Sequence, residues 1–317
     1  MRILTDLGIH PVLVDVGASG GAIDIWKPIA ANSVLVAFDP DLREMRQAAD
    51  GKFYREFVIN EAVTSDPSKS SVDFYLTRYP FCSSTLEPDI TSLSNFHFQD
   101  RFLVDGKATV RASTLDSVLK RISLDRIDWL KVDTQGTDLR IFTSLSDSVR
   151  SRVLALDIEP GLIDAYRGED LFADAHSYLS RRGFWLSNLN VGGAVRVRRA
   201  SLKAAIPDES LHYSYANRTL KMSPGWCEAR YLRTLESMAE NRCGRTEYAL
   251  LWVFAMLDGQ VGFATDAALE YESLFGPDEA GQLMKKESLA LMRKNSSYLL
   301  PAIKMKRRLK RARGKEE

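Results

Sequence analysis

The sequence predicts an α/β protein with a mostly parallel sheet, and three observations lead to this fold class. Apolar strands and helical segments alternate through roughly the first 190 of the 317 residues. The apolar run from Val12 to Val16 enters a small, glycine-rich turn at Gly17. A second apolar run, over residues 34–38, ends at Asp39. A strand, a glycine turn, a helix and a strand that ends in an acid are typical of half a nucleotide-binding domain.

The other elements of this domain follow in order along the chain. We expect a helix over 41–50, a strand over 53–60, and an inserted hairpin of 72–77 and 102–112 that encloses a long polar loop. The pattern then predicts helices over 114–119, 138–145 and 171–182, and strands over 127–133, 153–159 and 184–189. The last of these strands completes the sheet.

The pattern changes near residue 200. A short strand is expected over 213–222, and helices are expected from Pro224 onward because proline suits a first helical turn. We therefore predict a sheet domain over 1–200, a mostly helical extension over 201–300 and a flexible basic tail over 301–317. No apolar run is long enough to cross a bilayer, and the N-terminus lacks a signal-peptide pattern.

Cysteine usage and charge bear on the cellular compartment and on the class of binding partner. The three cysteines are widely spaced, which predicts neither a disulfide framework nor a zinc site and favours a cytoplasmic protein. Eight basic residues lie between 304 and 315. Without them and the last two glutamates, 35 basic and 40 acidic residues remain. The acidic body argues against a specific nucleic-acid partner, whereas the tail over 304–315 would suit a polyanion or the inner face of a membrane.

Polar residues stand at the ends of successive predicted strands. The first predicted strand ends with Asp15 and Gly17. The next predicted strands end at Asp39, Asn60, Asp133 and Glu159. Ligands of open α/β sheets bind beyond the carboxyl ends of the strands. The sequence therefore predicts a ligand site at this edge.

The glycine turn and Asp15 favour one cofactor. Asp15 lies inside the strand, where it would repel a pyrophosphate but attract the ammonium of S-adenosylmethionine. This arrangement favours S-adenosylmethionine over a nicotinamide dinucleotide. The residues expected to bind this cofactor are Asp15, Gly17, Ala18, Ser19, Gly20, Asp39 and Asn60.

Eight segments together resemble the FkbM-type methyltransferases, a family of S-adenosylmethionine-dependent enzymes. They are, in chain order, Asp15-Val16-Gly17-Ala18-Ser19-Gly20-Gly21, Phe38-Asp39-Pro40, Ser83-Ser84-Thr85-Leu86, Thr114-Leu115-Asp116, Leu130-Lys131-Val132-Asp133-Thr134-Gln135-Gly136, Asp157-Ile158-Glu159, Leu171-Phe172-Ala173-Asp174 and Arg182-Gly183-Phe184. The resemblance covers residues 10 to about 190, and the Lys131–Gly136 segment is its most specific part.

The resemblance implies a fold, a reaction and roles for two residues. It implies a Rossmann-like class I methyltransferase sheet with helices on both faces, to which this chain adds a helical C-terminal extension. It also implies methyl transfer to a hydroxyl of a sugar, glycan or glycosylated natural product. Gly17 and its neighbours would then line the methionine part of the cofactor, and Asp39 would bind the ribose. Asp39 and Asp138 stand where the family often has Glu, and we expect no direct role for Asp138.

Asp133 and Glu159 are the candidate catalytic residues. Either one could take the proton of the acceptor hydroxyl, or both could hold a magnesium ion if a metal is used. Asp133 could instead only cap its own turn. The candidate substrate-binding residues are Ser83, Ser84, His97 and Gln135.

Two other functions remain open at this point. One is a non-catalytic, cofactor-binding scaffold of a glycan-biosynthesis assembly, and the other is a nicotinamide-dependent oxidoreductase. The sequence does not indicate whether the protein is a monomer or an oligomer.

Overall fold

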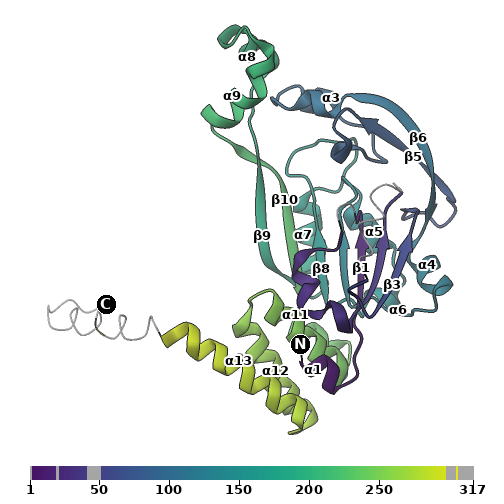
Figure 1. The fold of residues 1–317 in the computed structure, drawn as a ribbon, viewed down its shortest axis with the longest axis vertical. Helices are drawn as coiled ribbons and strands as arrows, with labels where there is room; N and C mark the ends of the chain where they lie inside the picture. Colours follow the sequence, from purple (N-terminus) through teal and green to yellow (C-terminus); the bar gives the residue numbers. More distant parts are fainter. Residues whose placement is uncertain (1, 19–20, 41–50, 298–304, 306–317) are drawn as a thin grey trace. The chain divides into compact units, whose positions relative to one another are not determined.

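The computed structural model describes residues 2–18, 21–40, 51–297 and 305 (Figure 1). The chain divides into two compact units. One spans residues 10–241, and the other combines residues 1–9 with residues 242–317. The boundary therefore lies about forty residues beyond the predicted one at 200. The predicted helix over 41–50 and almost all of the predicted tail lie outside the described residues.

The larger unit is built on a seven-stranded sheet, as predicted. Its strands, in sheet order, are β3 (Arg55–Ile59), β2 (Val34–Phe38), β1 (Val12–Val16), β7 (Trp129–Val132), β8 (Ala155–Ile158), β10 (Ser223–Arg233) and β9 (Phe184–Ala194). The pairs from β3 to β8 are parallel, whereas β10 runs antiparallel to both of its neighbours. Every residue of β1 and β2 is buried, as expected for central strands of a parallel sheet.

The strand register brings the predicted polar residues to one edge of the sheet. Val16 of β1 pairs with Phe38 of β2 and with Val132 of β7, and Val132 pairs with Ile158 of β8. The residues that follow these strands, Gly17, Asp39, Asp133 and Glu159, therefore leave the sheet at the same level. The carboxyl edge of the sheet is thus the place where a site forms.

Side chains from both faces of the sheet are buried by helices. One face packs against α4 (Leu115–Arg121), α5 (Asp138–Ser144) and α7 (Phe172–Ser180) in a single apolar cluster. On the other face, Trp26 of the 3-10 helix η1 (Asp24–Asn32) packs edge-on against Trp129 of β7. The helix predicted after the glycine turn is therefore a 3-10 helix. The predicted fold class is confirmed.

The inserted hairpin is also present, and it belongs to a second, three-stranded sheet. β5 (Ser71–Thr77) pairs antiparallel with β6 (Val104–Ser113), and β6 pairs in parallel with the short β4 (Ala62–Val63). The loop between the hairpin strands carries the short helices η2 (Pro80–Cys82), α3 (Ile90–Leu93) and η3 (Gln99–Phe102). This loop is ordered by apolar packing of Leu93, Phe102 and Tyr166.

The prediction for residues 213–233 was wrong in both of its elements. Residues His212–Thr219 form helix α9, and Ser223–Arg233 form strand β10. Burial alternates along β10, where Gly225, Cys227, Ala229 and Tyr231 face inward. An alternation with a period of two is typical of a β-strand. The prediction of a helix rested instead on Pro224, which lies at the start of this strand.

The segment between β9 and β10 forms a small cap. It contains α8 (Arg199–Ala205), η4 (Glu209–Leu211) and α9, around a cluster of Val195, Leu202 and Ala216. The two strands that carry it are 11 residues each, so they extend beyond the central strands of five or fewer (Figure 1). α10 (Leu235–Glu240) ends the larger unit.

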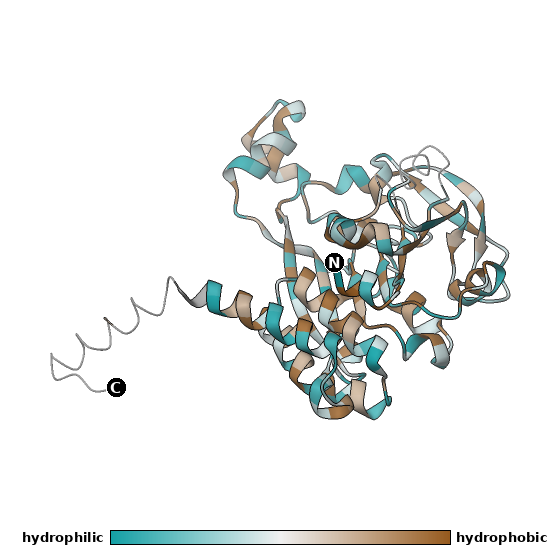
Figure 2. Cartoon of the chain, turned by 60° about the horizontal axis from the view of Figure 1, so that its bottom comes forward, coloured by the Kyte–Doolittle hydropathy of each residue, from teal (hydrophilic) through white to brown (hydrophobic). Residues whose placement is uncertain are grey.

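The smaller unit is helical. It consists of α1 (Arg2–Asp6), α11 (Arg245–Leu257), α12 (Val261–Phe275) and α13 (Glu279–Ser297). α12 packs against both α11 and α13, and Tyr248 of α11 donates a 2.6 Å hydrogen bond to Glu270 of α12. Hydrophobic and hydrophilic residues alternate along these helices (Figure 2). Among the described residues, no helix has the length and hydrophobicity that a membrane span requires.

The backbone conformation at Gly17 and its close approach to β7 both require a glycine, and a substitution can test this requirement. Its φ is +80°, and a Cβ at this position would collide with the carbonyl oxygen of Asp133. We expect Gly17→Ala to lower the free energy of unfolding by about 2–4 kcal/mol, measured by urea denaturation. Gly168→Ala is the matched control because its φ is +69° with open space around the Cβ. Equal losses in the two variants would contradict the close approach.

Candidate active site

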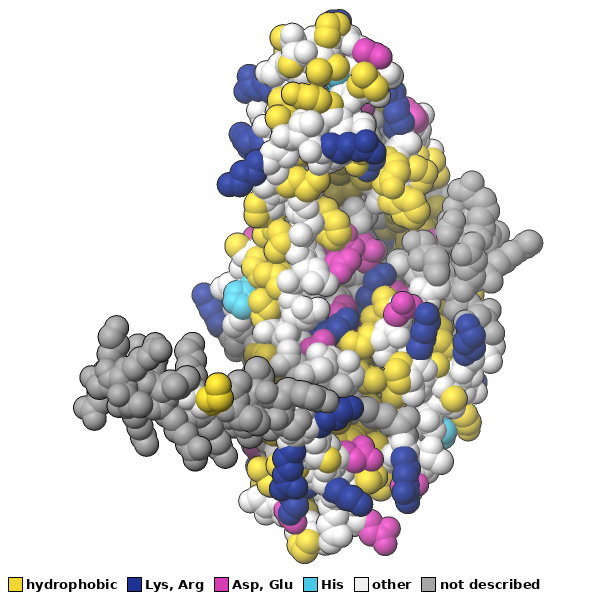
Figure 3. All heavy atoms as spheres, turned by 60° about the vertical axis from the view of Figure 1, so that its left-hand side comes forward, with side chains coloured by type: hydrophobic (Ala, Val, Ile, Leu, Met, Phe, Trp, Pro, Cys, Tyr) yellow, Lys and Arg dark blue, Asp and Glu magenta, His cyan; other side chains and the backbone are white. Residues whose placement is uncertain are grey.

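A large cavity lies at the carboxyl edge of the seven-stranded sheet. Its volume is about 1610 Å³, more than the roughly 300–1,000 Å³ typical of a single ligand pocket, so it has room for two molecules. Its lining includes Gly17, Asp39, Asn60, Asp133, Gln135 and Glu159 from the strand ends, Phe74, Leu76, Ala108 and Val110 from the hairpin, and Tyr213, Asn217, Met222 and Trp226 from the cap and β10. On the face drawn in Figure 3, hydrophobic side chains gather beside a hollow in which acidic side chains are visible.

Asp15 does not reach this cavity. It is fully buried, and its Oδ1 lies 3.1 Å from Nζ of Lys131, on the neighbouring strand β7. Burial raises the pKa of Asp15 to about 6, although the Lys131 ammonium opposes this shift. Burial disfavours the charge of Lys131, but the carboxylates of Asp15 and Asp133 outweigh it and raise the Lys131 pKa to about 12. In this structure Asp15 therefore pairs with the ammonium of Lys131, and its predicted contact with the cofactor stays a prediction.

Two residues of the glycine turn that we expect to bind the cofactor, Gly17 and Ala18, are described by the structure. Gly17 lines the cavity, but Ala18 is buried outside it. The N–H groups of both residues donate to the carbonyl oxygen of Phe38, so neither is left for a ligand. The Gly17 carbonyl accepts a 2.8 Å hydrogen bond from Lys131. Ser19 and Gly20 lie outside the described residues.

Asp39 and Asn60 lie together at the ends of β2 and β3. Asp39 is only 7% exposed, yet it lines the cavity, as does Asn60. The Asn60 side-chain amide donates a 2.9 Å hydrogen bond to the Asp39 carbonyl. Asn60 thus fixes the backbone that presents the Asp39 carboxylate.

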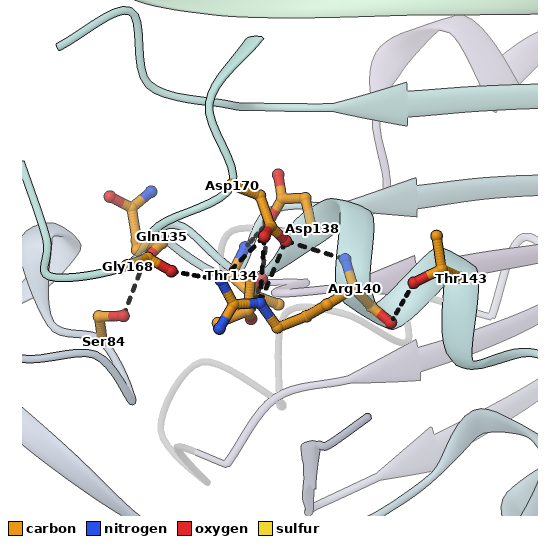
Figure 4. A network of polar contacts seen from close by, with 9 residues as sticks. Ser84, Thr134, Gln135, Asp138, Arg140, Thr143, Gly168 and Asp170 are labelled. Atoms are coloured by element: carbon orange, nitrogen blue, oxygen red, sulfur yellow. Dashed lines mark hydrogen bonds and ion pairs between the residues drawn. The ribbon is translucent and has the colours of Figure 1, made fainter. Parts of the chain in front are cut away.

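Gln135 orders the turn that follows β7. Its φ is +56°, a left-handed conformation that is uncommon for a residue other than glycine. Its side-chain amide donates to Asp133 at 2.9 Å and accepts from the Tyr166 hydroxyl at 3.2 Å. Ser84 donates a 2.7 Å hydrogen bond to the Gln135 carbonyl (Figure 4). These contacts hold Asp133 and Gln135 at the cavity wall.

The surroundings of Glu159 favour its protonated form. Burial, the charge of Asp133 and a hydrogen bond to Asp133 together raise its pKa from 4.5 to about 9. Both side chains line the cavity. Asp133 and Glu159 therefore form an acid pair in which Glu159 is the hydrogen-bond donor.

Asp138 has a structural role that the sequence did not reveal. It is 1% exposed and accepts hydrogen bonds from the Thr134 backbone at 2.9 Å and the Thr134 hydroxyl at 2.6 Å (Figure 4). Its other oxygen accepts from the Glu159 backbone at 2.8 Å. Burial and the charge of Asp133 raise its pKa to about 6. Asp138 therefore ties the turn after β7 to the end of β8.

The predicted substrate-binding residues fall into two groups. Ser83, His97 and Gln135 line the cavity. Ser84 is fully buried outside the lining and supports Gln135, so its predicted contact with a substrate stays a prediction. His97 lies with Nδ1 3.3 Å from the Val195 carbonyl, and burial lowers its pKa.

The described residues contain no group of three or more His, Cys, Asp or Glu side chains that could hold a metal ion. Asp133 and Glu159 are only two ligands, and they share a proton. The predicted magnesium ion therefore finds no support in this arrangement.

Comparison with known proteins identifies the family of the central segment. The fold is the predicted Rossmann-like methyltransferase sheet. Residues 32–186 match the methyltransferase FkbM domain, so this segment belongs to that family, and the resemblance seen in the sequence is confirmed. Membership of this family implies the use of S-adenosylmethionine.

The other comparisons add little. Among curated proteins, no relative matches the chain. A solved structure of a TehB-like SAM-dependent methyltransferase from Corynebacterium glutamicum is 11% identical, with 74% of this chain and 86% of that chain covered. Its TM-score is 0.28, which is too low to indicate a shared activity.

The acid pair predicts a pH-dependent stability. Because folding raises the Glu159 pKa, its contribution to stability is complete below about pH 4.5 and is lost as pH rises toward 9. Glu159→Gln keeps a hydrogen-bond donor for Asp133 but cannot ionise. We expect it to stabilise the protein by about 1–2 kcal/mol at pH 8 and to give no gain at pH 4, measured by thermal unfolding. A gain of the same size at both pH values would contradict the shared proton.

Proposed function

We propose that the protein is an S-adenosylmethionine-dependent O-methyltransferase that acts on a hydroxyl of a sugar, glycan or glycosylated natural product. The observation that carries this proposal is that Asp39 and the Asp133–Glu159 pair line one cavity at the carboxyl edge of the sheet. The cavity is large enough for a methyl donor and an acceptor together.

The residues at the ends of β1, β2 and β3 fit the cofactor. The Asp39 carboxylate can accept hydrogen bonds from both hydroxyls of a ribose, and Asn60 holds its backbone in place. Gly17 lines the cavity beside them at the end of β1. When bound, S-adenosylmethionine supplies an electrophilic methyl group. In this structure the charge of Asp15 is matched by Lys131.

Asp133 is the proposed general base. A sugar hydroxyl is a weak nucleophile until a base takes its proton. The raised pKa of Glu159 makes it a hydrogen-bond donor rather than a base, and Asp133 lines the cavity beside it, so we assign the role of base to Asp133. Gln135 keeps the Asp133 carboxylate in position. Positioning of the acceptor hydroxyl beside Asp133 would supply much of the remaining rate enhancement.

The cavity walls also suit a sugar ring. Tyr79, Phe81 and Trp226 line it and are partly exposed. Aromatic rings offer flat apolar faces against which the C–H faces of a pyranose can pack. The hydroxyl-bearing edge of such a ring would then face the polar strand ends.

Cofactor binding tests the assignment of Asp39. We expect saturable binding of S-adenosylhomocysteine by calorimetry, and we expect Asp39→Ala to weaken it by about tenfold or more because the ribose hydroxyls lose their acceptor. Asp24→Ala is the control, since the Asp24 side chain is 88% exposed on η1. Unchanged affinity in the Asp39 variant, or no binding to the wild-type protein, would contradict the proposal.

Turnover separates an enzyme from a non-catalytic scaffold. The protein should transfer radiolabelled methyl groups from S-adenosylmethionine to at least one member of a panel of hydroxylated sugars and glycosides. Binding of the cofactor without transfer to any acceptor would favour the scaffold.

A further inference from the structure

One cation stands out in the upper wall of the cavity. Among the described residues that line it, Arg101 is the only lysine or arginine. The floor carries the carboxylates of Asp39 and Asp133 beside the protonated Glu159. Glu61 also lines it, but its charge is paired with Arg111 and Arg121. Arg101 therefore gives the cavity a positive charge apart from its acidic floor.

Two tyrosines hold the Arg101 guanidinium in place. Its central carbon lies 4.5 Å from the ring centre of Tyr79 and 4.1 Å from that of Tyr213. Tyr79 precedes η2, and Tyr213 belongs to α9 of the cap, so the contact joins two separate segments. Contact with ring faces orients a guanidinium and leaves its N–H groups at the edge available as donors.

Arg101 has no anionic partner among the residues that the structure describes. Across the residues that the structure describes, its guanidinium makes no ion pair and no hydrogen bond. The nearby acids are committed elsewhere: Asp100 and Glu209 pair with Arg199 at 3.4 and 2.5 Å, and Asp105 lies 3.9 Å from Arg78. A guanidinium carries five N–H donors, and a partly buried one normally has them matched.

Arg101 and the acid pair line the same cavity. Burial raises the pKa of the Cys82 thiol to about 11, and the charges of Arg101 and Glu159 both act on this thiol in opposite directions. Cys82 thus lies within electrostatic reach of both groups. One small molecule in the cavity can therefore face Arg101 at one end and the Asp133–Glu159 pair at the other.

We propose that the acceptor carries an anionic group, a carboxylate or a phosphate, and that Arg101 binds this group while a hydroxyl of the same molecule faces Asp133. This inference rests on the proposed function, because it concerns the acceptor of the same reaction. The acidic floor repels the anion and Arg101 attracts it, so the two charges select one orientation of the acceptor. The two charges would not select one orientation of a neutral sugar in this way.

Chemical labelling of the full-length protein tests the anion site. Phenylglyoxal modifies accessible arginines, and peptide mass spectrometry follows Arg101 and Arg199 in the same sample. The probes are inorganic phosphate, glucose 1-phosphate and glucuronate, with methyl glucoside as the neutral control, all at equal ionic strength. We expect the anionic sugars to slow the labelling of Arg101 by about fivefold or more and that of Arg199 far less. The comparison of phosphate with carboxylate identifies the group preferred.

Substitution gives a second readout. Binding of the best anionic probe, measured by ligand-detected NMR, should be lost in Arg101→Gln and reduced in Arg101→Lys, which keeps the charge without the guanidinium fork. Arg199→Gln should leave it unchanged. Thermal unfolding of each variant verifies that its fold is intact, and binding of S-adenosylhomocysteine verifies that its cofactor site is intact.

The outcomes separate this inference from the proposed function. Protection of Arg101 by an anionic probe but not by methyl glucoside, with loss in Arg101→Gln, supports it. No protection by any of the three anions, or equal protection by the neutral sugar, overturns it. If S-adenosylhomocysteine binds normally in that case, only the anionic acceptor is disproved. Failure of the wild-type protein to bind S-adenosylhomocysteine would count against the proposed function instead.

Discussion

The contact between the end of β1 and the end of β7 is the constraint on which the site depends. Lys131 crosses between the two strands, where its ammonium pairs with Asp15 at 3.1 Å and donates to the Gly17 carbonyl at 2.8 Å. The same ammonium lies 3.8 Å from Asp133. Removing one partner of a buried ion pair leaves the other charge uncompensated, at a cost of about 3–5 kcal/mol. One lysine therefore fixes the glycine turn and a candidate catalytic acid together.

The rest of the acidic edge is held by a second set of contacts. Asp138 joins the turn after β7 to the end of β8, and Gln135 holds Asp133 from the side. The result is four carboxyl groups, those of Asp15, Asp133, Asp138 and Glu159, near one lysine. Burial and mutual repulsion raise the pKa values of three of them. Such crowding is costly to the fold and is typical of functional sites.

The sequence was sufficient for the sheet but not for the details of the site. Apolar strands that end in polar residues identified Gly17, Asp39, Asn60, Asp133 and Glu159, and all of them line the cavity. The partner of Asp15 could not be predicted because no local pattern shows that a lysine 116 residues later forms an ion pair with it. The contacts of Asp138 and Arg101 could not be predicted because they come from long-range packing, with the backbone of Glu159 and with Tyr213. The strand β10 was not predicted because Pro224 was given more weight than the alternation of inward-facing and outward-facing residues that follows it.

A crystal structure of the protein with S-adenosylhomocysteine would test the central claim most directly. The claim is that Asp39 and the Asp133–Glu159 pair belong to one methyl-transfer site. The account predicts that the ribose hydroxyls bind the Asp39 carboxylate and that the sulfur faces the acid pair. A ligand bound away from Asp39 would contradict it.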